Sequence, residues 1–364
     1  MIVFVCAGCD ARLTTPLSQV ALPPHAHQQY GNGIQLPVLM ESGTFAVDPE
    51  PWGPPWRPWK DIDPDEAAAR GIYAPVHALS DGAPGAAVIS PGDAQGTVLV
   101  PERAGGYCCG LDGADGPNMA CESCGLAVAS RIDDCSLWQA VWLAPNAVRR
   151  LLVDADDSPL PWGELAAEGK GTPPLEPITS WGSQGWLNHW WSWSPQWEAA
   201  AGRALAHLLV ASGGRPVTVP DGLVSEVFQR ALDILLPRGL PARRAVLAGP
   251  GLPVPDPDAD ILLVPDHPQT GEPWTHAGPA YAVPLPYGVW RWLVSPEPNL
   301  PNPASGGTPH GVLRDDPPAQ RPDSLFRADS RVFQHTLVRL PASASPWLRE
   351  ILENRTQLMR ARVF

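Results

Sequence analysis

The sequence contains few positively charged residues and almost no lysine. Its 364 residues include 25 Lys and Arg, with lysine only at Lys60 and Lys170, against 38 Asp and Glu, so the formal net charge is −13. A nucleic-acid binder normally carries a basic face, because phosphate contacts dominate its affinity. The longest basic runs here are two Arg-Arg pairs, at 149–150 and 243–244. We therefore expect no nucleic-acid partner.

Long apolar runs are missing as well. No stretch approaches the roughly 20 apolar residues that a helix needs to cross a bilayer. The opening segment 1–6 is too short for the apolar core of a signal peptide. The sequence thus predicts no membrane contact and a cytoplasmic location, where thiols stay reduced. In that compartment the seven cysteines indicate metal ligands or buried thiols before disulfides.

Familiar catalytic motifs are also absent from the sequence. It has no His-Glu-x-x-His, no Walker A motif, no Gly-x-Ser-x-Gly and no zinc-deaminase pattern. The Ala-Gly-Pro-Gly run at 248–251 lacks the spacing of a dinucleotide-binding loop and favours a plain turn. Asp266 and His267 end a predicted strand and, with His276, could join a site at the carboxyl edge of a sheet. The more conservative interpretation is that they are exposed loop residues.

Proline and glycine are abundant instead, with 46 Pro and 34 Gly. Much of the chain must therefore run as ordered loops, although a hydrophobic content of 44% still permits a sizeable core. We expect a mixed α+β fold with a zinc-ribbon-like β element at 1–155. A Pro/Gly-rich, loop-rich insertion would occupy 10–120. A linker and Trp-rich segment (156–195) then precede an α/β domain with a C-terminal helix (196–364).

Local signals predict individual elements. Asp63 reads as the N-cap of a short helix that ends at Gly71. Further helices should begin after Ser194-Pro195, Asp221 and Ser345-Pro346. The predicted strands are 2–5, 98–100, 136–143, 216–219, 244–248, 260–264 and 281–285.

Tryptophan is about three times as frequent as usual, at 16 residues, and six of them fall between 181 and 197. Such a block could form an exposed aromatic surface that docks a protein partner. It could equally anchor the linker onto the core, because Trp is mostly buried on average. Packing is the favoured interpretation.

Two Cys-x-x-Cys turns carry the clearest chemistry in the chain. Cys6 and Cys9 follow a predicted strand, and Cys121 and Cys124 precede one. Such a turn lets two thiolates grip one tetrahedral Zn²⁺. The residue after the second cysteine often needs a left-handed backbone, which the glycine at 125 adopts freely and the aspartate at 10 tolerates.

These turns resemble the paired knuckles of zinc-ribbon proteins. The resemblance implies one structural Zn²⁺ held by Cys6, Cys9, Cys121 and Cys124, and it implies no activity. It is limited to the knuckles, and the segment 10–120 between them is far longer than in a compact ribbon. That segment would be an insertion closed at its neck by the metal.

Other uses of the cysteines stay open. A rival quartet of Cys109, Cys121, Cys124 and Cys135 would make a local site and leave Cys6 and Cys9 free. A second metal could use Cys109 and Cys135 with His25 or His27, but packed thiols are the simpler interpretation for Cys108, Cys109 and Cys135. A thioredoxin-like redox role would need a helix directly after the motif, and neither turn has one in the sequence.

Two functional hypotheses follow. The first is a zinc-binding cytoplasmic protein that acts as a binding or scaffolding module, with a protein partner. The alternative is an enzyme acting on a small molecule through a pocket in the 195–295 region or at its junction with the zinc part.

Overall fold

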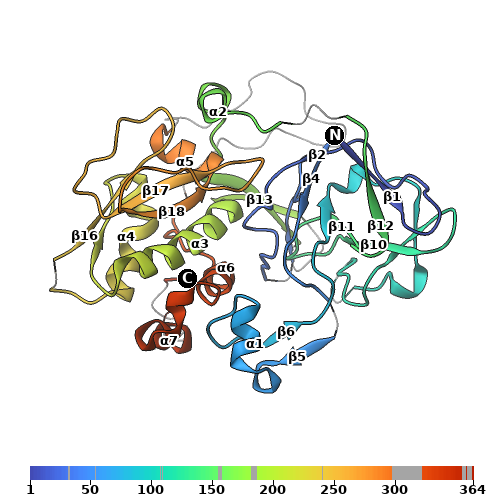
Figure 1. Ribbon diagram of the computed structural model, residues 1–364, viewed down its shortest axis with the longest axis horizontal. Coiled ribbons are helices and arrows are strands. Elements are labelled where there is room, and N and C mark those ends of the chain that lie inside the picture. Colours follow the sequence, from blue (N-terminus) through green and yellow to red (C-terminus); the bar gives the residue numbers. More distant parts are fainter. Residues whose placement is uncertain are drawn as a thin grey trace.

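The computed structural model describes residues 1–31, 33–53, 55–106, 108, 110–154, 158–181, 187–239, 241–296, 322–354, 358 and 363–364. Two lobes lie side by side, an N-terminal lobe (residues 1–154) and a C-terminal lobe (the described residues from 158 onward) (Figure 1). Both helices and several sheets are present, so the expected α+β class is confirmed.

A seven-stranded sheet forms the centre of the N-terminal lobe. Its strands, in spatial order, are β2 (Ser18–Gln19), β4 (Thr44–Val47), β7 (Ala87–Ile89), β11 (Ala140–Leu143), β10 (Ala127–Ile132), β9 (Met119–Cys121) and β8 (Thr97–Leu99). Neighbours pair antiparallel except β2 with β4. Phe4, Leu13, Phe45, Ile89 and Leu143 are buried in the adjoining core.

The segment 10–120 contributes strands to this sheet and is otherwise rich in loops. It supplies β2, β4, β7 and β8 and the first residues of β9, which pair with one another and with the strands after residue 126. It also forms a small subdomain from β5 (Trp56–Pro58), α1 (Pro64–Ala69) and β6 (Ala78–Ser80). The expected N-cap is confirmed there, since the Asp63 carboxylate accepts hydrogen bonds from two amides of α1.

A separate two-stranded ribbon lies beside the sheet. It pairs β1 (Ile2–Cys6) with β12 (Val148–Leu152) in antiparallel register, with Cys6 opposite Val148. The predicted strand at 2–5 is therefore confirmed. The strand predicted at 136–143 is confirmed only over Ala140–Leu143, because Ser136 adopts a left-handed backbone with φ 69°.

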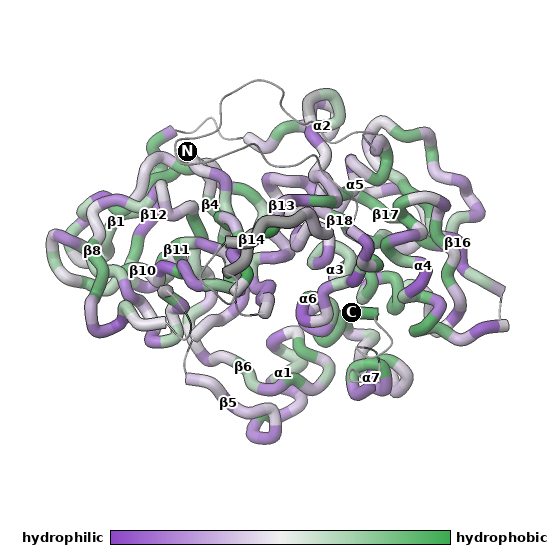
Figure 2. Tube along the Cα trace, turned by 180° about the vertical axis from the view of Figure 1, so that it is seen from behind, coloured by the Kyte–Doolittle hydropathy of each residue, from purple (hydrophilic) through white to green (hydrophobic). Residues whose placement is uncertain are grey.

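A parallel four-stranded sheet organises the C-terminal lobe. Its strands lie in chain order, β15 (Val217–Thr218), β16 (Arg243–Leu247), β17 (Ile261–Asp266) and β18 (Tyr281–Pro286). The helices of this lobe are α2 (Trp162–Glu168), α3 (Pro195–Ser212), α4 (Leu223–Leu235), α5 (Tyr287–Val294), α6 (Ser330–Leu337) and α7 (Pro346–Glu353). Hydrophobic stretches alternate with polar ones in both lobes (Figure 2).

Helix starts follow the sequence signals with one correction. α3 and α7 begin at Pro195 and Pro346, directly after the predicted serines. α4 begins at Leu223 with Gly222 as its N-cap, not Asp221, because the chain turns through a positive φ of 83° at Gly222. Short 3-10 helices cover Trp59–Asp61, Pro91–Asp93, Pro101–Arg103 and Pro341–Ala344.

The range predicted to be a linker contains regular structure. α2 lies within it, as does β13 (Leu175–Trp181), which pairs with β14 (Leu187–Trp193) on one side and with β3 (Ile34–Gln35) on the other. The sheet β14-β13-β3 therefore joins the two lobes. The domain boundaries themselves stay a prediction.

The Trp-rich block is packed where its side chains are described. Trp193 and Trp197 are 5% and 1% exposed, and their indole N–H groups donate to the carbonyls of Ser324 and Thr172. Trp186 lies outside the described residues, as do residues 297–321.

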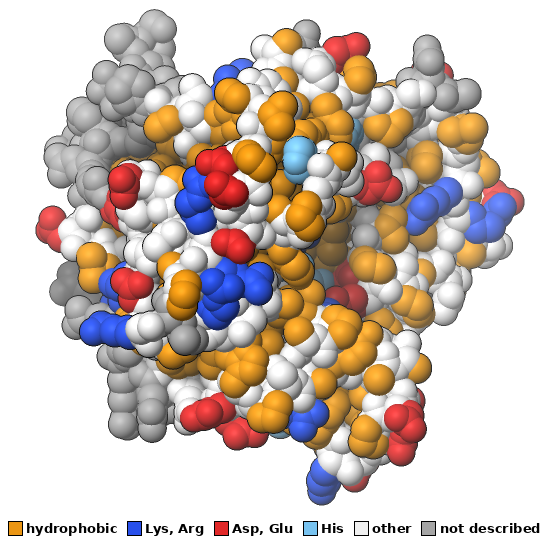
Figure 3. Space-filling model, turned by 60° about the vertical axis from the view of Figure 1, so that its left-hand side comes forward, with side chains coloured by type: hydrophobic (Ala, Val, Ile, Leu, Met, Phe, Trp, Pro, Cys, Tyr) orange, Lys and Arg blue, Asp and Glu red, His pale blue; other side chains and the backbone are white. Residues whose placement is uncertain are grey.

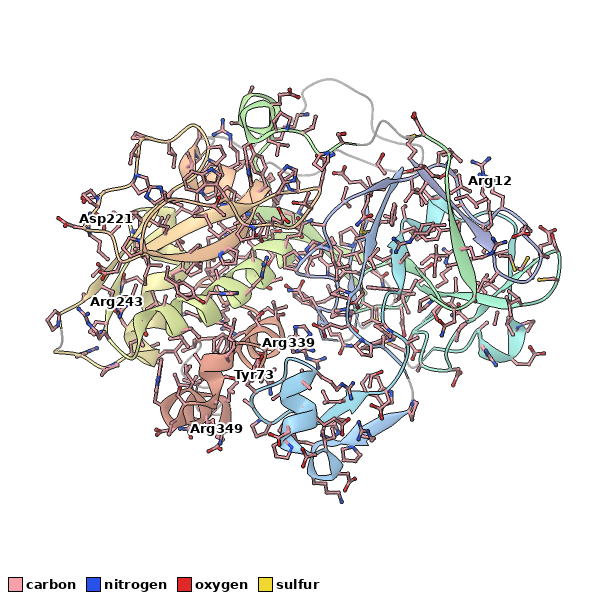
Figure 4. The ribbon with its side chains drawn as sticks, viewed as in Figure 1. Arg12, Tyr73, Asp221, Arg243, Arg339 and Arg349 are labelled. Carbon is pink, nitrogen blue, oxygen red and sulfur yellow. The ribbon has the colours of Figure 1, made fainter. Side chains whose placement is uncertain are left out.

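Direct contacts also connect the lobes. The buried Gln28 amide donates to the carbonyl of Pro195 at 3.0 Å and to the carboxylate of Asp329 at 3.2 Å. The Tyr73 amide donates to the Val338 carbonyl at 2.8 Å. Tyr73 and Arg339 accordingly lie close together where α1 approaches α6 (Figure 4).

Candidate metal centre

The two Cys-x-x-Cys turns have the same backbone structure. In the first, the Asp10 amide donates to the Cys6 carbonyl and the Cys6 amide to the Ala11 carbonyl, at 3.0 and 2.8 Å. In the second, the amides of Gly125 and Cys121 make the equivalent bonds to the carbonyls of Cys121 and Leu126, both at 2.8 Å. The fifth residue of each turn has a positive φ, 62° at Asp10 and 74° at Gly125, as the sequence predicts.

Neighbouring elements hold the turns face to face. The first turn leaves β1 and is tied to the end of the ribbon by a bond from the Ala7 amide to the Ala147 carbonyl at 2.9 Å. The second leaves β9 and is tied to the sheet by a bond from the Glu122 amide to the Gly96 carbonyl, also at 2.9 Å. Gly8 leaves room between them, since a Cβ there would already touch the Cys124 Sγ at 3.5 Å.

The four sulfurs form one compact cluster. All lie within 4.8 Å of one another, with Cys6 Sγ 3.5 Å from Cys124 Sγ and Cys9 Sγ 3.6 Å from Cys121 Sγ. A tetrahedral Zn²⁺ with Zn–S bonds of about 2.3 Å would place its sulfurs roughly 3.8 Å apart. The cluster can therefore hold a metal ion, and its donor set and spacing fit a tetrahedral one.

Hydrogen bonds from backbone amides favour the thiolate form of cysteines in the cluster. Burial raises the pKa of Cys121, but hydrogen bonds from the amides of Ser123 and Cys124 and from neighbouring sulfurs outweigh it and lower the value to about 7. At Cys9 a bond from the Ala11 amide lowers the pKa, yet the crowded sulfurs raise it to about 12. A divalent cation would relieve this crowding, because it neutralises thiolates that otherwise repel one another.

The comparisons with known proteins give no further identity. No protein-family model matches the chain, and no curated protein and no solved structure shows significant similarity to it. The resemblance to zinc ribbons is thus supported by the paired turns alone.

A second, smaller group of cysteines lies apart from the first. Cys108 Sγ and Cys135 Sγ are 3.1 Å apart, and Asp134 completes a three-residue group within 4.8 Å. The rival quartet required Cys135 to join Cys121 and Cys124. Among the described residues, Cys135 instead neighbours Cys108, and Cys6 and Cys9 complete the four-sulfur cluster, so that hypothesis was wrong. Cys109 lies outside the described residues.

The two histidines considered for a second metal have other partners. His25 is buried and packs at a tilt against Trp138 with ring centroids 4.4 Å apart, and burial lowers its pKa to about 3. His27 bonds to the Asp48 carboxylate at 2.8 Å. Neither belongs to a metal-competent group among the described residues.

A cleft of about 980 Å³ lies between the lobes. The N-terminal lobe lines it with parts of 20–27, 38–41 and 44–50, and the C-terminal lobe with residues from α3, α6 and the carboxyl ends of β17 and β18. Asp266 and His267 lie in its wall. The expectation that they are exposed loop residues was wrong, because each is only 6% exposed.

These two residues play different parts. The His267 ring is fully used, with Nδ1 accepting from the amides of Gln269 and Thr270 and Nε2 donating to the Leu160 carbonyl at 2.8 Å. The His267 ring therefore holds the loop that follows β17 in place. Asp266 forms an ion pair with Arg203 through Oδ2, whereas its buried Oδ1 has no hydrogen-bond partner among the described residues. Burial raises the Asp266 pKa despite this arginine.

On the face drawn in Figure 3, the described Lys and Arg side chains are interspersed with acidic ones. None of the helices in the described residues combines the length and the hydropathy that a bilayer crossing requires.

Proposed function

We propose that this protein is a zinc-stabilised binding module whose single structural Zn²⁺ is held by Cys6, Cys9, Cys121 and Cys124. The observation that carries the proposal is the four-sulfur cluster, with its near-tetrahedral spacing and two equivalent turns. Zinc is the ion that four thiolates from paired knuckles most commonly bind.

The donor set supports a structural rather than a catalytic ion. A catalytic zinc keeps a coordination position for water or substrate. Four thiolates fill every position of a tetrahedral ion, so the metal would act by linking elements. Here it would link the β1–β12 ribbon to the seven-stranded sheet, which otherwise meet through the core around Phe4 and Phe45.

A protein partner is part of the proposal. Trp52 and Trp56 are 57% and 49% exposed and pack edge to face with ring centroids 5.4 Å apart. Exposed Trp side chains are enriched at binding hot spots, because they bury a large area with little loss of conformational entropy. A reducing compartment such as the cytoplasm would keep the thiols available for the metal.

Metal analysis of cysteine variants tests the zinc assignment. The purified full chain should contain one zinc per molecule, and Cys6→Ser with Cys121→Ser should abolish it. The matched control is Cys108→Ser with Cys135→Ser, which changes the same number of thiols outside the cluster and should keep the zinc. One zinc that survives the first pair of changes with the fold intact would refute the proposal.

The cleft supports a second candidate function, an enzyme that acts on a small molecule. The specific observation is Asp266, a buried carboxylate in the cleft wall with a raised pKa and an oxygen without a partner. Such groups are over-represented among catalytic acids and bases. Turnover that Asp266→Asn abolishes, with ligand binding retained, would favour this function; turnover that the variant leaves unchanged would exclude Asp266 from it.

A further inference from the structure

The two walls of the cleft carry different charges. The lining residues of the N-terminal lobe include three carboxylates, Glu41, Asp48 and Glu50, and no Lys or Arg. Those of the C-terminal lobe include three cations, Lys170, Arg203 and Arg331, and one carboxylate, Asp266. The cleft is therefore polarised across its width.

Two of the three acidic groups on the N-terminal side already have hydrogen-bond partners. Asp48 accepts from His27 at 2.8 Å and from the Glu50 amide at 2.9 Å. Glu50 accepts from His335 at 3.0 Å and forms an ion pair with Arg339. Glu41, which is exposed, has no ion pair among the described residues.

The cations on the C-terminal side are less completely paired. Arg203 is bound to Asp266, but that pair uses only one of the guanidinium nitrogens. Arg331 donates to the neutral side-chain amide of Gln29. Lys170 is exposed and forms no ion pair among the described residues. Lys170 and Arg331 therefore leave positive charge on this wall that no carboxylate of the described residues neutralises, although the net charge of the chain is −13.

The fold places this wall where open parallel sheets bind ligands. Asp266 ends β17 and lies opposite Pro286, the last residue of β18, in the parallel register. Tyr287 and Gly288, which begin α5, also line the cleft. Ligands of open α/β sheets bind outside the carboxyl ends of their strands.

The opposite wall offers apolar surface for the body of a ligand. Leu22, Val38, Leu39, Met40 and Val47 all line the cleft. His27 also lines the cleft and stacks on Trp52 and Trp142, with ring centroids 5.7 and 5.4 Å away. A mostly apolar cavity with a few convergent charged groups is typical of small-molecule sites.

We propose that the cleft binds a small organic anion, with its oxyanion (a phosphate or a carboxylate) on Lys170, Arg331 and Arg203 and its body against the N-terminal wall. Arginine and lysine donate charge-assisted hydrogen bonds to either oxyanion. The unpartnered Asp266 Oδ1 would accept a hydrogen bond from a hydroxyl or amine on the same ligand. This inference deepens the second candidate function and is independent of the zinc.

Titration calorimetry with three six-carbon sugar derivatives tests the ligand class. Glucose, gluconate and glucose 6-phosphate share a body of similar size, and only the last two carry a carboxylate or a phosphate. The full chain should bind gluconate, glucose 6-phosphate or both at least about tenfold more tightly than glucose. Binding of one acid alone identifies the oxyanion as carboxylate or phosphate. Equal affinity for all three, or no binding by either acid at about 10 mM, overturns the proposal.

Two charge-matched double variants test whether the acid binds in the cleft. Lys170→Gln with Arg331→Gln should weaken acid binding by roughly tenfold or more, because each removes a charge-assisted contact. The control, Arg238→Gln with Arg349→Gln, removes the same charge from two exposed sites outside the cleft; Arg349 lies on α7 (Figure 4). Equal weakening in both variants means a general charge effect and also overturns the proposal. Acid binding without turnover of any probe leaves this inference intact while removing the support for an enzyme.

Discussion

Asp10 and Gly125 occupy equivalent positions one residue after each Cys-x-x-Cys pair, and both have a left-handed backbone. This detail could be predicted from sequence, because the turn is local and few residue types tolerate that conformation. The sequence also suggests that the two turns meet, because four thiolates from two such turns can share one metal ion. The pairing of Cys108 with Cys135 had no such motif to reveal it.

Gly125→Ala should destabilise the zinc-loaded protein by about 1 kcal/mol. The cost is conformational, because nothing lies within 4 Å of the added Cβ. Gly125→Asn should cost less, since Asn tolerates positive φ better. Urea unfolding of the three proteins measures both effects, and an alanine variant as stable as wild type would show that the turn does not require this backbone.

Glu198 should make stability depend on pH. Burial raises its pKa from 4.5 to about 7, a shift that the Tyr30 hydroxyl bond and the charge of Arg327 only partly oppose and that Asp329 and Glu176 reinforce. The native state therefore binds more protons than the unfolded state between about pH 4.5 and 7, so stability falls as pH rises through this window and is constant above it. The contribution is roughly 3 kcal/mol at most.

Replacing Glu198 with Gln should remove this part of the pH dependence while keeping an acceptor for Tyr30. Urea unfolding at pH 5 and pH 8 should show a clearly smaller loss of stability for Glu198→Gln than for wild type. Some slope should remain, because burial also raises the Glu176 pKa to about 7. An unchanged slope in the variant would contradict the role assigned to Glu198.

At the level of elements, α3 and α6 pack at unusually short range. Gly202 lies in the middle of α3, and a Cβ there would stand 2.5 Å from the carbonyl oxygen of Asp329. Gly202→Ala should thus destabilise the protein by about 1–3 kcal/mol through overpacking, although alanine is the better helix former. Gly163→Ala, in α2, meets nothing within 4 Å and should stabilise by up to about 1 kcal/mol.

Thermal unfolding of these two alanine variants separates packing from propensity. The prediction is a lower Tm for Gly202→Ala and an equal or higher Tm for Gly163→Ala. A stabilising Gly202→Ala would mean that α3 and α6 are farther apart than described.

Elements that begin at a proline or consist of an apolar, β-prone run are predictable from sequence, and elements defined by tertiary context are not. α3, α7, β16, β17 and β18 follow proline starts or β-branched runs and were predicted. α6 was missed although Asp329 caps it and Val332, Phe333 and Leu337 form its buried face, so the signal was present. α5 has no side-chain cap and continues directly from β18, which leaves no boundary in the sequence to mark it.

At the level of the whole molecule, a pocket at the junction of the two parts could be proposed from sequence, but the residues that line the cleft could not. The cleft brings residues 20–50 against residues 170–336, and no local pattern encodes a contact of that range. The pairing of β3 with β13, which joins the lobes, is likewise a contact between residues far apart in the sequence. Asp266 was identified as a candidate by its place at a strand end, but its ion pair with Arg203 from α3 is a tertiary contact that the strand pattern does not encode.

Metal removal should destabilise the N-terminal lobe before the C-terminal lobe. After chelation, amide hydrogen exchange should accelerate in β1, β9 and their turns by several orders of magnitude, because structural zinc contributes directly to folding. Amides of α3 and β17, in the core of the C-terminal lobe, should keep most of their protection. Uniform loss of protection, or none, would contradict a zinc that stabilises the N-terminal lobe.

X-ray absorption at the zinc edge of the Cys108→Ser, Cys135→Ser protein tests the four-thiolate zinc site, because the four-sulfur cluster is then the one metal-competent group left among the described residues. We predict four sulfur neighbours at about 2.3 Å and no lighter ligand. Nitrogen or oxygen atoms in the first coordination shell, or a purified protein without zinc, would contradict it.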